Sequence, residues 1–330
     1  MGRFIGLWTN KGKGGTGPGG VEEYNRASGI TTDSNNNVTA ITIGDTEYTN
    51  ITYNSDRLIT QYKESIGGVD KTWDVNYDSN NLVQTIAEQI PPQPDGQVLY
   101  TNPGNYTWIC PGGHTSVSVV CVGAGGGGGG ALAWKNNISV TPGQSYAVVV
   151  GSPGSAGGAG IEGTAGGDSS FNGTLIAEGG KGTSTDTNKG GYSGADGGGN
   201  GGPAGLYGYN GGGAGGYSGD GGTAQVGAGD ESAQSGGGGA AAGAWAYYAG
   251  GGVGIMGATG QTGADGTGNG EGGSGGQTGK GEGLENQNSE TGGDYGGGYS
   301  SRWSGNKGGR GAVRILWGGG RSFPNNAGDV

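Results

Sequence analysis

The sequence predicts a mainly β protein in which a region of β-hairpin repeats precedes a domain of strands and glycine-rich extended helices. Asx-rich turns recur between alternating β-branched residues early in the chain. Of the 91 glycines, 16 fall in the first 122 residues and 75 in the remaining 208. A strand-like apolar run returns at 312–317, which argues against the disorder that such glycine enrichment usually indicates.

The first segment, residues 1–20, is a short basic and aromatic arm without acidic residues. Because the whole chain has a net charge of −11, we expect such an arm to dock onto something larger. A frayed terminus is the alternative. The candidate anchor residues are Arg3, Phe4, Leu7, Trp8, Lys11 and Lys13.

Residues 21–90 are predicted to form a run of short β-hairpins. The segment that starts at Asp33 (DSNNNVT) recurs from Asp78 (DSNNLVQ), with a looser copy from Asn54 (NSDRLIT). Asx residues tolerate the left-handed conformation that tight turns need. The pattern resembles the Tyr-Asp repeats of β-hairpin proteins over these few units. A calcium loop beginning at Asp33 is the competing interpretation, but it lacks the glycine and the bidentate glutamate that such a loop requires.

A proline-rich stretch at 91–97 is the predicted linker between two domains. Apolar runs of strand length follow it, and the last of them comes after a long glycine-rich tract. Because that last strand has to join the others, the tract is predicted to be an insertion within a domain that spans 98–330. The predicted strands are 105–110, 116–122, 131–140, 144–150, 170–177 and 312–317.

The first two of these strands are predicted to pair as a hairpin around residues 111–114. Cys110 would then lie opposite Thr115, and Cys121 would sit at the far end of the ladder, beyond disulfide reach. We therefore expect both cysteines to be small buried hydrophobic residues.

Glycines in the tract recur every third residue in several runs, such as 199–211 and 251–266. A period of three matches the extended polyproline II (PPII) helix, which forms no internal hydrogen bonds. Such a helix must find backbone partners in its neighbours, and only glycine lets the backbones approach closely enough. A collagen triple helix would need unbroken triplets and more than the 10 prolines present. The register therefore predicts a bundle of polyglycine helices folded from one chain.

The charge balance and the hydropathy exclude several classes of function. A pI near 4.5 argues against nucleic acid as a partner, because phosphates need clustered Lys and Arg. No run of 18 apolar residues is present, so we expect no membrane insertion. The first residues lack the apolar core of a secretory signal, which predicts synthesis in the cytoplasm.

No motif in the sequence predicts an enzyme, a cofactor or a metal. The glycine-rich segment 123–128 follows a strand and so mimics a dinucleotide fingerprint. However, further strands are predicted after it, where the dinucleotide fold requires a helix. His114 is the one histidine, too few for a catalytic triad or a metal cluster.

Five aromatic residues in the tract are candidate receptor contacts, because exposed rings on rigid loops stack on sugars or grip partners. The alternative is that these rings cover the outside of the glycine bundle. They are Tyr207, Tyr209, Trp245, Tyr247 and Tyr248.

Several segments resemble the glycine-rich domain of bacteriophage tail and virion proteins, most closely those of phages that infect marine cyanobacteria. They are 106–111 (YTWICP), 119–125 (VVCVGAG), 138–143 (ISVTPG), 167–171 (GDSSF), 311–318 (GAVRILWG) and 320–325 (GRSFPN). A related domain occurs in the extracellular part of anaplastic lymphoma receptor kinases. The resemblance covers about residues 98–326 and implies a small β-sandwich that carries a polyglycine helix bundle.

The same resemblance implies a non-enzymatic structural protein of a bacteriophage virion, assembled in the host cytoplasm. One expectation is a homotrimeric tail fibre or adhesin, whose arm binds other virion proteins and whose glycine-rich loops contact a host-surface glycan or protein. The alternative is a capsid decoration or head-fibre protein that coats or stabilises the particle.

Overall fold

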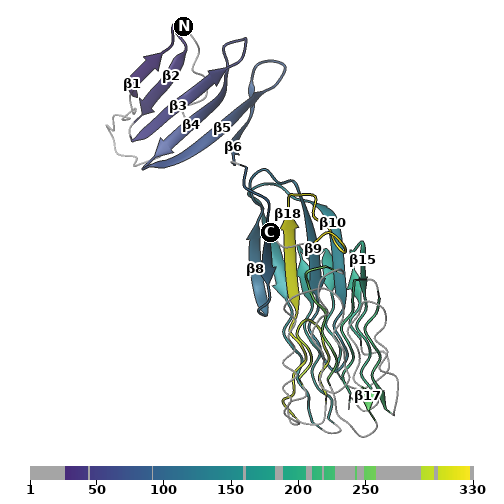
Figure 1. Ribbon diagram of the computed structural model, residues 1–330. Coiled ribbons are helices and arrows are strands. Elements are labelled where there is room, and N and C mark those ends of the chain that lie inside the picture. The colour runs from purple at the N-terminus through teal and green to yellow at the C-terminus, as the bar shows by residue number, and fades with distance from the viewer. Residues whose placement is uncertain are drawn as a thin grey trace. The chain divides into compact units, whose positions relative to one another are not determined.

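The computed structural model divides into two compact units, Met1–Pro91 and Pro92–Val330, which we describe separately. All the regular elements in its described residues are β-strands, so the protein is mainly β as predicted (Figure 1). The described residues are 27–43, 45–90, 92–158, 161–182, 189–205, 210–217, 219–226, 242–243, 249–257, 291–300 and 304–327.

The first unit contains a six-stranded antiparallel sheet, sheet A, in which each strand pairs with the next along the chain. This meander confirms the run of hairpins. Its strands are β1 (Ala27–Thr32), β2 (Val38–Ile43), β3 (Thr46–Tyr53), β4 (Ile59–Ile66), β5 (Val69–Tyr77) and β6 (Val83–Gln89).

The three repeated turns of sheet A share one hydrogen-bond pattern. In the first, Asp33 Oδ1 accepts from the main-chain nitrogens of Asn35 and Asn37, at 2.8 and 2.9 Å. Asn54 and Asp78 make the same pair of bonds in the second and third turns. A residue with φ near +60° completes each turn, and it is an asparagine, which tolerates this conformation, in two of the three (Asn36 and Asn81) and Arg57 in the other.

Two five-stranded antiparallel sheets, with one smaller parallel pair, form the second unit (Figure 1). Sheet B has the order β15-β10-β9-β18-β7, and sheet C the order β14-β13-β12-β11-β8. The strands of sheet B are β7 (Gly96–Tyr100), β9 (Ser116–Val122), β10 (Leu132–Ser139), β15 (Gly197–Gly199) and β18 (Ala312–Trp317). Those of sheet C are β8 (Gly104–Ile109), β11 (Ser145–Val150), β12 (Ser169–Phe171), β13 (Leu175–Ala177) and β14 (Tyr192–Ser193). The parallel pair is β16 (Gln225–Val226) with β17 (Ala242–Gly243).

The predicted hairpin between 105–110 and 116–122 is wrong, because β8 pairs with β11 while β9 pairs with β10 and β18. Burial explains the difference. Six of the seven residues of β9 are buried, which suits a strand covered on both faces, whereas β8, at the edge of sheet C, alternates between exposed positions and positions that are buried or half-buried. The returning strand β18 lies between β9 and β7, as the insertion hypothesis requires.

The predicted strand 170–177 is two strands, β12 and β13, joined by a tight turn. Asn172 and Gly173 have φ of +50° and +64°, which reverses the chain between them. The strand β7 begins at Gly96, within the stretch expected to be linker. That stretch is fastened to the second unit, because Gln93 N donates to Gly112 O at 2.8 Å.

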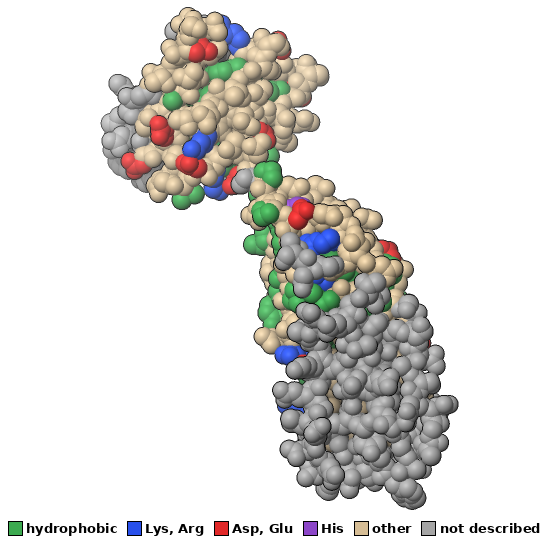
Figure 2. All heavy atoms as spheres, viewed as in Figure 1, with side chains coloured by type: hydrophobic (Ala, Val, Ile, Leu, Met, Phe, Trp, Pro, Cys, Tyr) green, Lys and Arg blue, Asp and Glu red, His purple; other side chains and the backbone are tan. Residues whose placement is uncertain are grey.

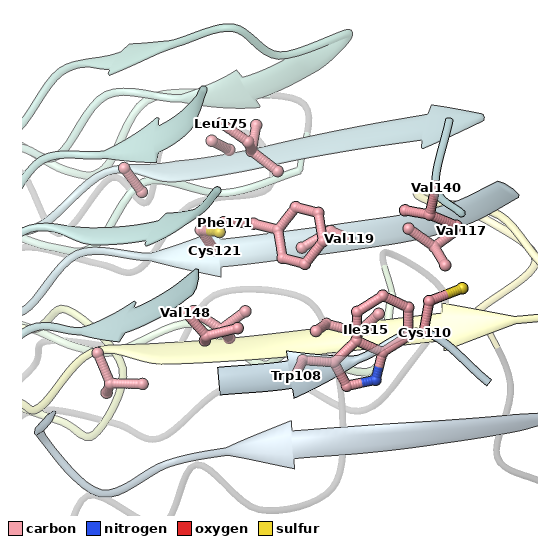
Figure 3. Packing of buried hydrophobic residues seen from close by; sticks show 14 of the residues in the cluster. Trp108, Cys110, Val117, Val119, Cys121, Val140, Val148, Phe171, Leu175 and Ile315 are labelled. Atoms are coloured by element: carbon pink, nitrogen blue, oxygen red, sulfur yellow. The ribbon is translucent and has the colours of Figure 1, made fainter. Parts of the chain in front are cut away.

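One hydrophobic core lies between sheets B and C (Figure 3). From sheet B it takes alternate residues of β9 and β18, such as Val119 and Ile315, and from sheet C it takes Trp108, Val148 and Phe171. These side chains are at most 5 % exposed. The alternation along β9 therefore divides its apolar run between two faces of sheet B.

The outer face of sheet B is covered by a second cluster drawn from distant parts of the chain. Val120 and Leu132 of the sheet pack there with Tyr217 and Ile255 of the glycine-rich tract and with Phe323 from the segment after β18. The ring of Phe323 stacks on that of Tyr217 at 6.1 Å. Because tract and C-terminal segment share this cluster, they bury the outer face together.

Candidate functional site

The glycine-rich segments among the described residues are held together by backbone hydrogen bonds around a central segment, residues 123–130. The residues of this segment bond to several different parts of the chain rather than to one or two neighbours. Five of its donor–acceptor pairs, at 2.7 to 3.0 Å, are Ala124 N to Gly167 O, Gly125 N to Gly309 O, Gly127 N to Lys181 O, Gly129 N to Gly202 O and Gly130 N to Gly296 O. This lattice is the most distinctive feature of the second unit.

Glycine is required sterically at many positions of the lattice. A Cβ added to Gly125 would lie within 3.0 Å of the Gly297 carbonyl oxygen, and one on Gly202 would meet Gly222 in the same way. Side-chain carbons essentially never lie that close to a backbone oxygen. These backbones therefore pack at distances that only glycine permits.

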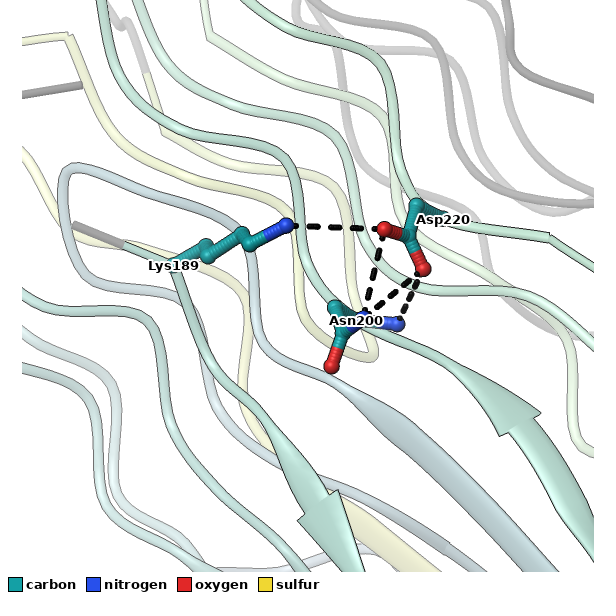
Figure 4. A network of polar contacts seen from close by, with 3 residues as sticks. All are labelled: Lys189, Asn200 and Asp220. Atoms are coloured by element: carbon teal, nitrogen blue, oxygen red, sulfur yellow. Dashed lines mark hydrogen bonds and ion pairs between the residues drawn. The ribbon is translucent and has the colours of Figure 1, made fainter. Parts of the chain in front are cut away.

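Acidic side chains in the tract accept hydrogen bonds from backbone amides. Asp220 accepts from the Asn200 main-chain nitrogen at 2.8 Å and from its side-chain nitrogen, and Lys189 Nζ lies 3.5 Å from the same carboxylate (Figure 4). Asp168 accepts from Gly179 N at 2.9 Å. These carboxylates add side-chain acceptors to the main-chain carbonyls of the lattice, so their geometry indicates a structural role.

Arg314 of β18 is fully buried on the outer face of sheet B. Its Nε donates to Gln97 Oε1 at 2.9 Å, and its Nη1 donates to the Ile255 carbonyl oxygen at 3.2 Å. Arg314 was not among the site residues predicted from the sequence. A charged residue inside an apolar strand (AVRILW) is nevertheless a signal of a buried polar contact. The arginine links two strands of sheet B to the glycine-rich tract.

The segment after β18 is tied to sheet B by the side chain of Asn136. Its Nδ2 donates to Phe323 O at 2.7 Å, and its Oδ1 accepts from Phe323 N at 2.9 Å. The two bonds resemble the pair of main-chain hydrogen bonds that two opposite residues exchange in an antiparallel β-sheet. They hold the Phe323 ring against Tyr217. Burial raises the pKa of the Tyr217 hydroxyl, and a hydrogen bond from the Gly257 nitrogen partly opposes this rise.

Sheet A has one face rich in aromatic residues. Tyr62 lies at its centre, with the Trp73 ring stacked beside it at 6.5 Å and the Tyr48 ring edge-on at 5.9 Å. Glu64 accepts hydrogen bonds from the Tyr48 hydroxyl and from Trp73 Nε1, at 3.3 and 3.1 Å. In the view of Figure 2 the first unit shows acidic and basic side chains interspersed, with hydrophobic side chains in small patches.

The remaining candidates for chemistry are dispersed. Cys110 and Cys121 are free and buried, and burial raises the pKa of both thiols. His114 Nε2 lies 2.9 Å from the Gln93 carbonyl oxygen, so the ring fastens the proline-rich stretch to the turn. Within the described ranges no group of three or more His, Cys, Asp or Glu residues is placed to hold a metal ion.

Two sets of predicted site residues lie outside the described residues. One is the set of candidate receptor contacts, Tyr207, Tyr209, Trp245, Tyr247 and Tyr248. The other is the set of candidate anchor residues, Arg3, Phe4, Leu7, Trp8, Lys11 and Lys13. In the part of the chain that the structure does describe, we find no helix with the length and hydropathy that a membrane crossing requires.

Comparison with known proteins places the second unit in context. A family model described as a glycine-rich domain matches residues 101–318, more than half of the chain. The match begins just after β7 and ends just after β18, so it includes the central segment and most of both sheets. No curated protein matches the chain.

Proposed function

We propose that this chain, which belongs to the glycine-rich domain family, is a non-enzymatic structural protein of a bacteriophage particle. In this proposal it is a homotrimeric tail fibre or adhesin-like appendage that contacts the host surface. The arm at residues 1–20 attaches it to other virion proteins, and the glycine-rich domain projects outward. The backbone lattice around residues 123–130 is the observation that carries the proposal, because hydrogen bonds between distant backbone segments suit a structural role.

We further propose that the tract is a bundle of PPII-type polyglycine helices on a β-sandwich made of sheets B and C. The bonding of the central segment supports this. A β-strand bonds to two neighbours, whereas a helix with three residues per turn directs successive amides about 120° apart. The carbonyl oxygens of the successive residues Ala124, Gly125 and Gly126 accept hydrogen bonds from three different segments, at Gly180, Gly154 and Tyr299, as the three-fold helix requires.

A bundle of this kind suits an exposed appendage. Its hydrogen bonds are made within the chain, so it keeps its shape without the large apolar core that a globular domain needs. The helices run side by side, which gathers the loops that connect them at the ends of the bundle. Loops on such a scaffold can vary in sequence without disturbing it, and this suits host recognition.

Limited proteolysis tests the bundle. We expect residues 98–317 to remain as one resistant core, because the glycine-rich segments that the structure describes are bonded to their neighbours. Rapid cutting throughout 180–300 would contradict the bundle.

The location on the particle is tested by imaging intact particles labelled with an antibody against residues 150–300. Label at the tail tip is the expected result. Label distributed over the head would favour the alternative, a capsid decoration or head-fibre protein. Particles without label would contradict a virion role altogether.

A further inference from the structure

Sheet A presents an apolar face whose hydrophobic cluster, among the described residues, contains residues of that sheet alone. Residues paired across antiparallel strands point to the same face, so the pairs Ile30–Ile41, Tyr62–Trp73 and Val75–Ile86 all lie on it. The central side chains are Ile41, Ile51, Tyr62 and Val75, and each is 7–8 % exposed. The side chains at the centre of this face are therefore already shielded from solvent by their neighbours on the sheet.

The margin of the same face is apolar and open. Ile30, Ile66, Val69 and Ile86 are 60, 45, 62 and 47 % exposed, and Ile66 pairs with Val69 on this face. They surround the buried centre on three strand pairs. Exposed apolar side chains gathered on one face of a sheet mark a candidate interaction site.

The opposite face of sheet A is polar, so it can remain exposed to solvent without a binding partner. Its paired residues include Thr42 with Glu47 and Ser65 with Asp70. On the apolar face the charged groups are already satisfied, since Lys71 Nζ lies 2.9 Å from Glu88 Oε2 and Glu64 accepts two hydrogen bonds. An occupant of the apolar face therefore needs to supply hydrophobic side chains rather than partners for those charges.

The segment before β1 has the composition, charge and length for this task. The arm, residues 1–20, carries three basic residues and no acid, whereas residues 27–90 carry nine acids and three basic residues. Its apolar residues include Phe4, Leu7 and Trp8. The 26 residues before β1 reach about 85 Å when extended, and six strands span only about 24 Å.

Attachment to the same chain favours this occupant over a second copy. A segment tethered next to its binding surface acts at an effective concentration of about a millimolar. Another copy reaches that level only in very concentrated solution. Opposite charge adds long-range attraction between the arm and the sheet.

We propose that, in the free chain, the arm docks Phe4, Leu7 and Trp8 on the apolar face of sheet A. Docking on a particle releases the arm from this face. The apolar surface is thus covered before assembly, and premature self-association is prevented. The inference goes beyond the proposed function, and intramolecular docking of the arm does not depend on a virion role.

The experiment is photo-crosslinking of the full chain with p-benzoylphenylalanine in place of Trp8. Equal amounts of ¹⁴N- and ¹⁵N-labelled protein are unfolded together and refolded before irradiation, so that any oligomer contains both labels, and crosslinked peptides are identified by mass. We expect crosslinks to peptides of β2–β6, all of single isotopic composition. Mixed-isotope crosslinks would show that a second copy covers the face, and crosslinks that avoid sheet A would show that the arm binds elsewhere. Either result overturns the proposal.

A matched pair of variants identifies the face. Ile86→Asp and Thr85→Asp add the same charge at adjacent exposed positions of β6, one on the apolar face and the other on the polar face. The crosslink yield is expected to fall several-fold with Ile86→Asp and to stay unchanged with Thr85→Asp. Equal yields in the two variants overturn the proposal, because the arm would then be indifferent to the apolar face.

Discussion

Arg314 and Ile255 are 59 positions apart in the sequence, and the guanidinium of the first donates to the main-chain oxygen of the second at 3.2 Å. The same guanidinium binds the Gln97 side chain. One fully buried cation thus joins β18, β7 and the glycine-rich tract on the outer face of sheet B. A hydrogen bond to a buried charge is stronger than a neutral one, so this contact fastens the tract to the sheets.

Arg314→Ala is expected to destabilise the protein by about 3 kcal/mol, because hydrogen bonds to charged groups contribute about 1.5–3 kcal/mol each. Arg310→Ala is the matched control. Its side chain is 37 % exposed and pairs with Asp294 at 2.8 Å, so its loss should cost about 1 kcal/mol or less. Urea unfolding of both variants measures the difference. Equal losses would show that Arg314 does not fasten the tract.

Gly202 and Gly205 belong to the same run of glycines at every third position, but they differ in their surroundings. A Cβ on Gly202 would overlap the Gly222 carbonyl, whereas one on Gly205 has its nearest neighbours at 3.6 Å. Gly202→Ala should therefore cost about 2 kcal/mol through overpacking. Gly205→Ala should be neutral or stabilise slightly, because alanine restricts the unfolded chain.

Thermal unfolding of these two variants checks the prediction. In a domain of this size, 1 kcal/mol corresponds to about 2–4 °C in Tm. We expect a clear fall for Gly202→Ala and no fall for Gly205→Ala. Similar values for the two would mean that close backbone packing is not what requires glycine in this tract.

Much of the sheet structure could be predicted from local patterns. The apolar runs of β9 and β18 and the Asx turns at Asp33, Asn54 and Asp78 have strong sequence signals, and the structure confirms them. The wrong hairpin arose because sequence proximity favours pairing of neighbouring strands. In the structure β9 pairs with β10 and β18 instead, because it is buried on both faces. Its outer face is covered by Phe323 and other residues far along the chain, which local patterns do not reveal.

The candidate site was less predictable for a related reason. The spacing of three marks glycine-rich segments, but it does not say which glycine faces a neighbouring carbonyl, as Gly202 and Gly205 illustrate. Partners in the lattice are distant in sequence, for example Gly125 with Gly309. No local pattern encodes such pairs. The predictions for the aromatic residues and for the arm remain predictions, because those residues lie outside the described ranges.

The first turn of sheet A should respond to acid. The carboxylate of Asp33 accepts hydrogen bonds from the Asn37 backbone and side chain, which lowers its pKa below the ordinary 3.8. A lowered folded-state pKa means that the carboxylate stabilises the turn above pH 3.8. This contribution is lost as the pH falls through the lower folded-state value.

The second turn provides an internal control for that titration, because Asn54 fills the equivalent position with an uncharged amide oxygen. Amide NMR shifts of Asn37 should change on acidification below pH 3.8, while those of Leu58 should not change with the same midpoint. A common midpoint in both turns would assign the change to the whole sheet rather than to Asp33.

Deleting residues 2–20 should remove the protein from purified particles while leaving its second unit folded. The arm is basic and aromatic on a chain of net charge −11, and the proposed function makes it the attachment to other virion proteins. Particles assembled with the full chain and with the truncated chain are compared for protein content, and proteolysis of the truncated chain checks that its 98–317 core persists. A variant in which Arg3, Lys11 and Lys13 are changed to Gln removes the charge of the arm and keeps its aromatic residues. Reduced incorporation of this variant would show that attachment depends on charge, and added salt, which screens charges, should then weaken attachment of the full chain. Normal incorporation of the truncated chain would mean that the anchor lies elsewhere and that the arm is only a frayed end.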